Sequence, residues 1–224
     1  MSSRHPDSLL IVIEGIDGAG KTTLANSLRT WLLDGGRSVT ISKEPTTGPW
    51  GMKLRESAAT GRLTPQDELD YLVKDREQHV SELISPALDC GEIVILDRYY
   101  PSTVAYQGAA GIPLNTVLDA HGFAPQPDVL LLLDVEPRVG IERIRARGDK
   151  PNAFETYDNL EACRAIFLDL EMPKVVINAA QSPEQVCAEA QFAILKELAE
   201  RGDPLKSDTE RVRDLIAVMP RLTA

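Results

Sequence analysis

The sequence has little cysteine, no excess of basic residues and no long apolar run. Its three cysteines are far apart and odd in number, so neither a disulfide framework nor a zinc site is indicated. A formal net charge of −10 argues against a broad nucleic-acid or acidic-membrane surface. No apolar run approaches membrane-spanning length, and residues 1–8 lack a signal peptide's apolar segment. We therefore expect a cytoplasmic protein that binds neither nucleic acid nor membrane.

A stretch near the N-terminus carries the clearest chemistry. Apolar residues 9–13 predict a strand buried on both faces, and a helical pattern follows after a short loop. That loop has the P-loop spacing Gly15-x-x-x-x-Gly20-Lys21-Thr22. Its backbone N–H groups can surround a phosphate, Lys21 can reach the outer phosphates, and the Thr22 hydroxyl can join a Mg²⁺ shell. The predicted nucleoside-triphosphate site comprises Gly15, Ile16, Asp17, Gly18, Ala19, Gly20, Lys21, Thr22 and Thr23.

Aspartates end two further apolar strands, at Asp97 and Asp134. An aspartate in this position near a P-loop commonly serves Mg²⁺ or its water shell. We prefer Asp97, because Arg98 beside it would add a cation at the phosphates. Asp134 resembles a cap for the helix that begins at Pro137. The predicted metal ligands are therefore Thr22 and Asp97.

Arg76 lies in a helical stretch, 65–88, on the same face as its apolar residues. A charged residue among core positions needs a partner or a ligand, so an internal ion pair and a ligand contact both remain open. Arg55, on an earlier helical stretch, is a candidate phosphate contact or a solvated surface charge. Further along, hydroxyl, aromatic and amide groups are spaced to line one pocket. They are Ser102, Thr103, Tyr106 and Gln107.

The helix predicted over 137–147 has a basic C-terminal end. Arg143 and Arg147 are four residues apart and share a face, just before Gly148. Arginines here are favourable with the helix dipole, and they would equally suit a lid that brings a cation onto a transferred phosphate. We assign such a short basic lid to about residues 143–155.

These segments together resemble the thymidylate kinases, which pass the γ-phosphate of ATP to dTMP. Besides the P-loop, the resemblance rests on Glu44-Pro45, on Asp75–His79 and on Asp97-Arg98-Tyr99 with the Ala-Tyr-Gln-Gly that follows. It also includes the run Arg143-x-Arg-x-Arg-Gly and covers roughly residues 9–200. It implies an α/β P-loop kinase fold, with a five-stranded parallel sheet flanked by helices. It further implies a homodimer that depends on Mg²⁺.

The resemblance also implies residue roles. Asp17 would bind the sugar 3′-hydroxyl and Arg76 a thymine carbonyl. Tyr106 would crowd the position of a ribose 2′-hydroxyl, and Arg98 would bridge the donor and acceptor phosphates. Together with the P-loop and the basic helix end, we expect the catalytic residues to be Lys21, Arg98 and Arg147, with Arg143 added to the ATP site. The expected dTMP-binding residues are Asp17, Glu44, Arg55, Leu72, Arg76, Arg98, Thr103, Tyr106 and Gln107.

Three departures from the family pattern stand out. Leu72 occupies a position that is usually aromatic and stacked on the base, while the adjacent Tyr71 would point elsewhere. Lys43 replaces the arginine that usually precedes Glu-Pro. The lid run 151–155 lacks the usual arginine, so its duty would pass to Arg143, Arg147 or Lys150.

Two other functions remain open. A deoxynucleoside kinase would need a general base for the hydroxyl, and Glu44 could accept that proton. A nucleotide-binding paralogue with weak turnover is the third interpretation, supported by the altered lid. In each case we expect a disordered N-terminus over 1–8, one domain over 9–201 and a C-terminal extension over 202–224.

Overall fold

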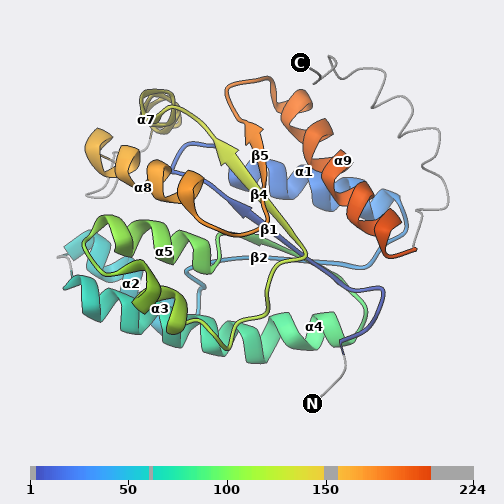
Figure 1. Cartoon of the computed structure of the whole chain (residues 1–224), viewed down its shortest axis with the longest axis horizontal. Coiled ribbons are helices and arrows are strands. Elements are labelled where there is room, and N and C mark those ends of the chain that lie inside the picture. Colours follow the sequence, from blue (N-terminus) through green and yellow to red (C-terminus); the bar gives the residue numbers. More distant parts are fainter. Residues whose placement is uncertain (1–3, 61–62, 149–155, 203–224) are drawn as a thin grey trace.

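The computed structural model describes residues 4–60, 63–148 and 156–202 (Figure 1). Lys150, the lid run 151–155 and all but the first residue of the expected C-terminal extension lie outside the described residues. Residues 4–8, expected to be disordered, do have described positions: Arg4 donates to the Ser8 hydroxyl at 2.9 Å and also pairs with Asp128. No helix in the described ranges has both the length and the apolar character needed to cross a bilayer.

The centre of the fold is a five-stranded, all-parallel sheet in the order β2-β3-β1-β4-β5. The central strand β1 pairs with β3 on one side and with β4 on the other. The order of the strands therefore changes direction at β1, which makes the carboxyl end of this strand a topological switch point. In open parallel sheets ligands bind at such a switch point, and the loop after β1 is the P-loop. The strands are β1 (Leu9–Glu14), β2 (Val39–Lys43), β3 (Ile93–Asp97), β4 (Val129–Asp134) and β5 (Val175–Asn178).

The sheet is buried between two helical layers. Leu9, Ile11 and Ile13 of β1 face a core shared with α1, α8 and α9, whereas Leu10 and Val12 face one shared with α4 and the π-helical turn η1. Figure 1 shows α1 and α9 on one side of the sheet and α3 to α4 on the other. All six side chains of β1 are buried, as a strand with two covered faces requires. Burying each such aliphatic side chain contributes about 1.5–3 kcal/mol.

The helices follow the predicted alternation, with one interruption. The stretch 65–88 is helical throughout but widens into η1 just before Pro86, which has no N–H to donate to the preceding turn. A short helix after α5, named α6, was not predicted. The helical elements are α1 (Lys21–Asp34), α2 (Pro49–Thr60), α3 (Pro65–His79), η1 (Val80–Ile84), α4 (Ser85–Asp89), α5 (Tyr100–Ala109), α6 (Leu114–Asp119), α7 (Pro137–Ala146), α8 (Tyr157–Asp169) and α9 (Pro183–Glu200).

Candidate active site

The P-loop is held against β4 and α7 by close backbone packing. Gly15 has φ +137°, and a Cβ there would lie 2.4 Å from the Leu133 carbonyl oxygen. Gly18 has φ +80°, and its Cβ would lie 2.2 Å from the carbonyl oxygen of Gly140 in α7. Only glycine fits either position. Sequence reasoning missed Gly140, although glycine inside a helix is costly enough to be a signal.

Lys21 is buried at the start of α1 and lies within the loop. Its Nζ donates to the carbonyl oxygens of Gly15 at 2.9 Å and Ile16 at 2.8 Å. Burial, together with the nearby Arg98 cation, lowers the pKa of Lys21 to about 8, against the opposing effect of carboxylates such as Asp17. A lysine with this pKa remains mostly cationic at neutral pH, so it can neutralise phosphate charge.

Thr22 and Asp97 form the pair predicted to serve a metal. The Thr22 hydroxyl donates to the Asp97 carboxylate, next to the P-loop. A hydroxyl and one carboxylate fit Mg²⁺, which keeps several waters and takes further oxygens from substrate phosphates. Among the described residues no cluster of three or more His, Cys, Asp or Glu side chains could hold a metal ion.

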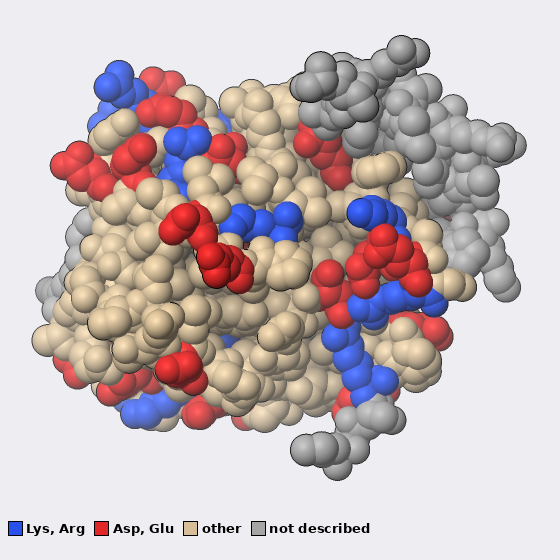
Figure 2. Space-filling model, in the orientation of Figure 1, with Lys and Arg blue, Asp and Glu red and all other residues tan. Residues whose placement is uncertain are grey.

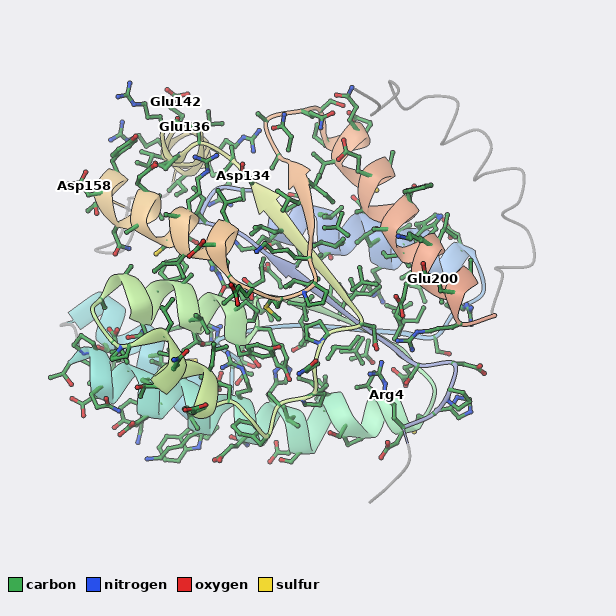
Figure 3. All side chains as sticks on the ribbon, viewed as in Figure 1. Arg4, Asp134, Glu136, Glu142, Asp158 and Glu200 are labelled. Carbon is green, nitrogen blue, oxygen red and sulfur yellow. The ribbon has the colours of Figure 1, made fainter. Side chains whose placement is uncertain are left out.

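Asp134, the competing aspartate, is engaged elsewhere. Its carboxylate accepts from Arg164 of α8 at 2.6 Å and 2.9 Å. The cap of α7 is Glu136, whose side chain accepts from the Arg138 amide at 2.9 Å, so the prediction that Asp134 caps this helix is wrong. Figure 3 shows Asp134 at the carboxyl end of β4 and Glu136 at the start of α7. The cap falls at Glu136 because that residue directly precedes Pro137, the first helical position.

Arg98 follows β3 and lies at the centre of the site. It has φ +75°, an uncommon conformation for a residue with a Cβ and one that tends to occur at functional sites. Its guanidinium donates to Asp17 at 2.5 Å, to the Ser102 hydroxyl at 3.0 Å and to the Tyr106 hydroxyl at 3.3 Å. These contacts hold a cation between the P-loop and α5.

Glu14 fixes the segment that carries Arg98. Its carboxylate, at the end of β1, accepts from the backbone amides of Tyr99 at 2.8 Å and Ser102 at 3.0 Å, and from the Ser102 hydroxyl. Burial raises the pKa of Glu14 to about 7, although Ser102 and Arg98 oppose the shift. Glu14 belongs to the P-loop segment that supports the family resemblance, but the sequence alone assigned it no role.

Asp17 and Tyr106 form a second polar pair beside Arg98. The Tyr106 hydroxyl donates to the Asp17 carboxylate at 2.8 Å. Burial acts to raise the pKa of Asp17, but the Arg98 and Lys21 cations outweigh it and lower that pKa to about 2. Burial raises the pKa of Tyr106 well above its usual value. The pair is therefore an ionised carboxylate and a protonated phenol, and the carboxylate can accept from a substrate hydroxyl.

A cavity of about 260 Å³ opens beside this pair, between α2, α3 and α5. Every residue expected from the sequence to bind dTMP lines it. Sequence reasoning gave no pocket role to four other lining residues: two belong to motifs of the family resemblance without an assigned role, and the other two resemble ordinary helix positions in the sequence. These are Pro45, Leu54, Glu68 and Tyr99.

Arg76 combines the two roles that the sequence left open, an internal ion pair and a place in the ligand cavity. Its Nε donates to Glu44 at 2.8 Å, and its Nη2 donates to Glu44 and, at 3.1 Å, to the Thr103 hydroxyl. Asp75, its neighbour in sequence, instead binds the amide and hydroxyl of Thr46. Arg76 thus has a buried ion-pair partner and also lines the cavity, where its Nη1 has no partner in the part of the chain that the structure describes.

Glu44 is fully engaged on both carboxylate oxygens. Oε2 accepts from Arg76, and Oε1 lies 2.9 Å from Nδ1 of His79, whose Nε2 lies 2.8 Å from the Ser42 hydroxyl. Burial acts to raise the pKa of Glu44, but Arg76 and His79 outweigh it and lower the pKa below its usual value. A carboxylate with this environment is a poor proton acceptor. His79 had a sequence signal, the Asp75–His79 run, but no predicted role.

The structure shows the surroundings of Leu72, which departs from the family pattern, and of its neighbour Tyr71. Leu72 lines the cavity, whereas Tyr71 stacks on Trp50 of α2 with ring centroids 5.8 Å apart. The prediction that Tyr71 points away from the base pocket is therefore confirmed. Arg55 donates to the carbonyl oxygens of Pro45 and Thr46, which holds the loop after β2 at the rim of the cavity.

The basic end of α7 is only partly described. Arg143 donates to the Ala179 carbonyl oxygen at 2.9 Å, next to the loop that precedes α9. Arg147 is the C-terminal cap of α7, and Gly148 follows with φ +84°. On the face shown in Figure 2, Lys and Arg are interspersed with Asp and Glu rather than gathered into one broad basic patch.

A P-loop at the switch point of a parallel sheet, next to a cavity lined by arginines, defines a P-loop nucleotide kinase. Comparison with known sequences narrows this class. A sequence model described as "Thymidylate kinase" matches residues 13–190, and the chain belongs to the thymidylate kinase family.

Similar curated proteins cover nearly the whole chain. "Thymidylate kinase" of Xanthomonas campestris pv. campestris (strain B100) is 62% identical over 197 residues, which cover 88% of this chain and 87% of that protein. "Thymidylate kinase" of Xanthomonas oryzae pv. oryzae (strain PXO99A) is 59% identical over 207 residues, 91% of each chain. "Thymidylate kinase" of Xylella fastidiosa (strain 9a5c) is 57% identical over 194 residues, 86% of this chain and 93% of that protein.

Proposed function

We propose that this protein transfers the γ-phosphoryl group of ATP to dTMP, giving ADP and dTDP. A phosphate oxygen of dTMP attacks the γ-phosphorus, and the bond from that phosphorus to the β,γ-bridging oxygen breaks. The observation that carries this proposal is the position of Arg98, which lies between the P-loop and the cavity lined by Asp17, Tyr106 and Arg76.

The reaction needs no general base, because the acceptor is already a phosphate anion. The protein's work is to neutralise charge repulsion and to hold the two substrates in line. Lys21 would neutralise the outer phosphates of ATP, and Arg98 would bridge the donor and acceptor phosphates. Bound Mg²⁺, held by Thr22 and Asp97, would supply further positive charge at the ATP phosphates.

The remaining polar groups would bind the acceptor. Asp17, ionised and beside the Tyr106 hydroxyl, suits the sugar 3′-hydroxyl. Arg76 and Gln107, both buried and lining the cavity, suit the edge of the base. Leu72 would contact the base by dispersion in place of aromatic stacking.

The alternative, a deoxynucleoside kinase, would need Glu44 as its general base, and the geometry of Glu44 does not favour that role. Both oxygens of Glu44 are occupied by Arg76 and His79, and its pKa is lowered, so it would not take a proton from a nucleoside hydroxyl. A nucleotide-binding paralogue with weak turnover is distinguished only by measuring turnover.

The test is an assay of the purified full chain with ATP, Mg²⁺ and either dTMP or thymidine, with product nucleotides separated by chromatography. We expect dTDP from dTMP and no dTMP from thymidine. Phosphorylation of thymidine with dTMP inert would favour the deoxynucleoside kinase. Binding of ATP and dTMP without turnover would favour the weakly active paralogue.

Replacing Tyr106 should test the proposed exclusion of ribonucleotides. We expect Tyr106→Ala to lower the ratio of kcat/KM for dTMP to that for ribothymidine monophosphate by about 10- to 100-fold. The reason is that the Tyr106 ring fills space beside Asp17 that a 2′-hydroxyl would need. Tyr106→Phe is the matched control, because it keeps the ring and removes only the hydroxyl. An unchanged ratio in Tyr106→Ala would rule out the steric gate.

Arg147 at the end of α7 is our candidate for the transition-state cation that the lid run lacks. We expect Arg147→Ala to lower kcat by roughly 10- to 1,000-fold with little change in the KM for dTMP, the pattern of an interaction made mainly in the transition state. Arg145, exposed on another face of the same helix, provides the control. Should Arg145→Ala be damaging and Arg147→Ala silent, the assignment within the lid is wrong.

We further propose that the protein is a homodimer, as the family resemblance implies, and that it is cytoplasmic, as its composition and cysteine usage indicate. The Trp50–Tyr71 stack, with the Lys53 and Lys74 ammonium groups over its rings, joins α2 to α3, and we place the contact with the second copy on this surface. Light scattering at several protein concentrations tests this. A monomeric mass throughout would overturn it.

A further inference from the structure

We propose that Glu68 is a positioning residue: it orients the carboxamide of Gln107, and so makes the cavity select an acceptor base with N3–H and a C4 carbonyl over a 4-amino base. The inference rests on the proposed function and extends it to a residue with no previously assigned role. Glu68 is on α3, and Gln107 is on the neighbouring α5 (Figure 1). Both line the cavity.

The contact between the two side chains sets the direction of the amide. Gln107 Nε2 lies 3.3 Å from Glu68 Oε2, with Glu68 5% and Gln107 3% exposed. A carboxylate can only accept hydrogen bonds, so the NH₂ group of Gln107 must face Glu68 and its carbonyl oxygen must face away. This conclusion follows from the chemistry of the pair, whichever way an amide is drawn.

The backbone holds the pair together. Leu69, next to Glu68, packs in the same small core as Val104, one turn before Gln107. Leu69 and Val104 are almost fully buried, so α3 and α5 keep a constant separation at this level. The contact between Glu68 and Gln107 is therefore built into the packing of the two helices.

With the amide oriented in this way, the residues that line the cavity include one buried acceptor atom and one buried donor atom without a hydrogen-bond partner. Within the described residues, Oε1 of Gln107 and Nη1 of Arg76 make no hydrogen bond, although both residues line the cavity. Arg76 can only donate, and Glu44 and Thr103 hold its other nitrogens. Buried polar atoms without protein partners are costly, so a ligand is their natural partner.

This pair of atoms matches one class of pyrimidine. A base with N3–H and a C4 carbonyl offers a donor and an acceptor, which complement Oε1 of Gln107 and Nη1 of Arg76. A 4-amino base offers an acceptor at N3 and a donor at C4, so it would oppose acceptor to acceptor and donor to donor. Sites that hydrogen-bond a substrate group reject analogues that leave those bonds unmade. If the side chain at position 68 could also donate, the amide could rotate and present its NH₂ group to N3.

The experiment compares dTMP with 5-methyl-dCMP, which differs only by the amino group at C4 and the loss of N3–H. We expect Glu68→Gln to lower the ratio of kcat/KM for dTMP to that for 5-methyl-dCMP by about 10- to 100-fold, because the introduced carboxamide can donate to Gln107 and release its orientation. Glu68→Asp keeps a group that only accepts, so it should retain most of the discrimination even if turnover falls. Asp70→Asn, exposed on the same helix, should leave the ratio unchanged.

A double-mutant comparison separates positioning from direct contact. In a Gln107→Met background, Glu68→Gln should produce no further change in the ratio, because the amide through which Glu68 acts is gone. A further change there, or an unchanged ratio in folded Glu68→Gln, would overturn the inference. If Glu68→Gln does not fold, Glu68→Asp and Glu68→Asn carry the same comparison.

Failure of the proposed function would look different. Wild-type protein that forms no dTDP from dTMP would overturn the kinase activity and not the base selection. The same ratio, measured as dissociation constants of the two nucleotides by calorimetry, tests Glu68 without any turnover. Equal affinities of wild type and Glu68→Gln for both nucleotides would then overturn the role of Glu68.

Discussion

Lys21→Ala is expected to lower kcat for dTMP phosphorylation by about a hundredfold or more while the fold is retained. Lys21 is buried in the P-loop, and the carbonyl oxygens of Gly15 and Ile16 hold its ammonium group in place. In the proposed mechanism this fixed positive charge lies where charge develops during phosphoryl transfer, so its removal should raise the barrier to the chemical step.

Steady-state kinetics with ATP and dTMP measure this effect, and thermal unfolding reports the fold. Lys196→Ala is the matched control, because Lys196 is exposed on α9 and pairs only loosely with Glu200 at 3.9 Å. It should change neither kcat nor the unfolding midpoint. If Lys21→Ala keeps more than about a tenth of wild-type kcat, catalysis does not depend on this loop as proposed.

Arg98→Ala should be at least as damaging, with a loss of kcat of roughly 10³-fold or more, the scale of an arginine that contacts transferring phosphate. Arg98 joins the P-loop to the cavity through Asp17, Ser102 and Tyr106, and its left-handed backbone conformation aims it there. Arg98→Lys keeps one positive charge but loses the planar fork that bonds several groups at once, so it should recover only part of the activity. Full activity of Arg98→Lys would show that a point charge suffices.

The same substitution should change the response to acid. Arg98 is the main group that lowers the pKa of Asp17 from 3.8 to about 2, against the effect of burial. A lowered carboxylate pKa contributes stability that is present above pH 3.8 and is lost as the pH falls towards 2. In Arg98→Ala that contribution should be missing already at neutral pH. Denaturant unfolding at about pH 7 and about pH 3 would therefore show a smaller difference between variant and wild type at the lower pH.

Local sequence patterns were sufficient for the P-loop and the strands. The spacing Gly15-x-x-x-x-Gly20-Lys21-Thr22 and the apolar run 9–13 depend on short-range rules, because the backbone of a phosphate loop and a doubly buried strand each impose their own residues. The choice of Asp97 over Asp134 as a metal ligand also used neighbouring residues only and stays a prediction; in the structure the Thr22 hydroxyl donates to Asp97.

Short-range sequence patterns could not predict contacts between segments that are distant along the chain. The cap of α7 was assigned to the wrong acidic residue, since Asp134 has a partner, Arg164, on a helix 30 positions later. The sequence left the ion-pair partner of Arg76 unnamed, and the structure shows that it is Glu44, 32 positions earlier. Gly140 showed its role only where its carbonyl meets Gly18.

The sequence by itself determined the class of the fold, the phosphate loop and the family, because each is written in residues close together along the chain. Only the tertiary structure decided which side chains meet in the cavity. It placed Glu44 between Arg76 and His79, and it brought Glu68 to Gln107. Hydrogen bonds and burial set the charge and direction of these groups, and both depend on which helices pack together rather than on spacing along the chain.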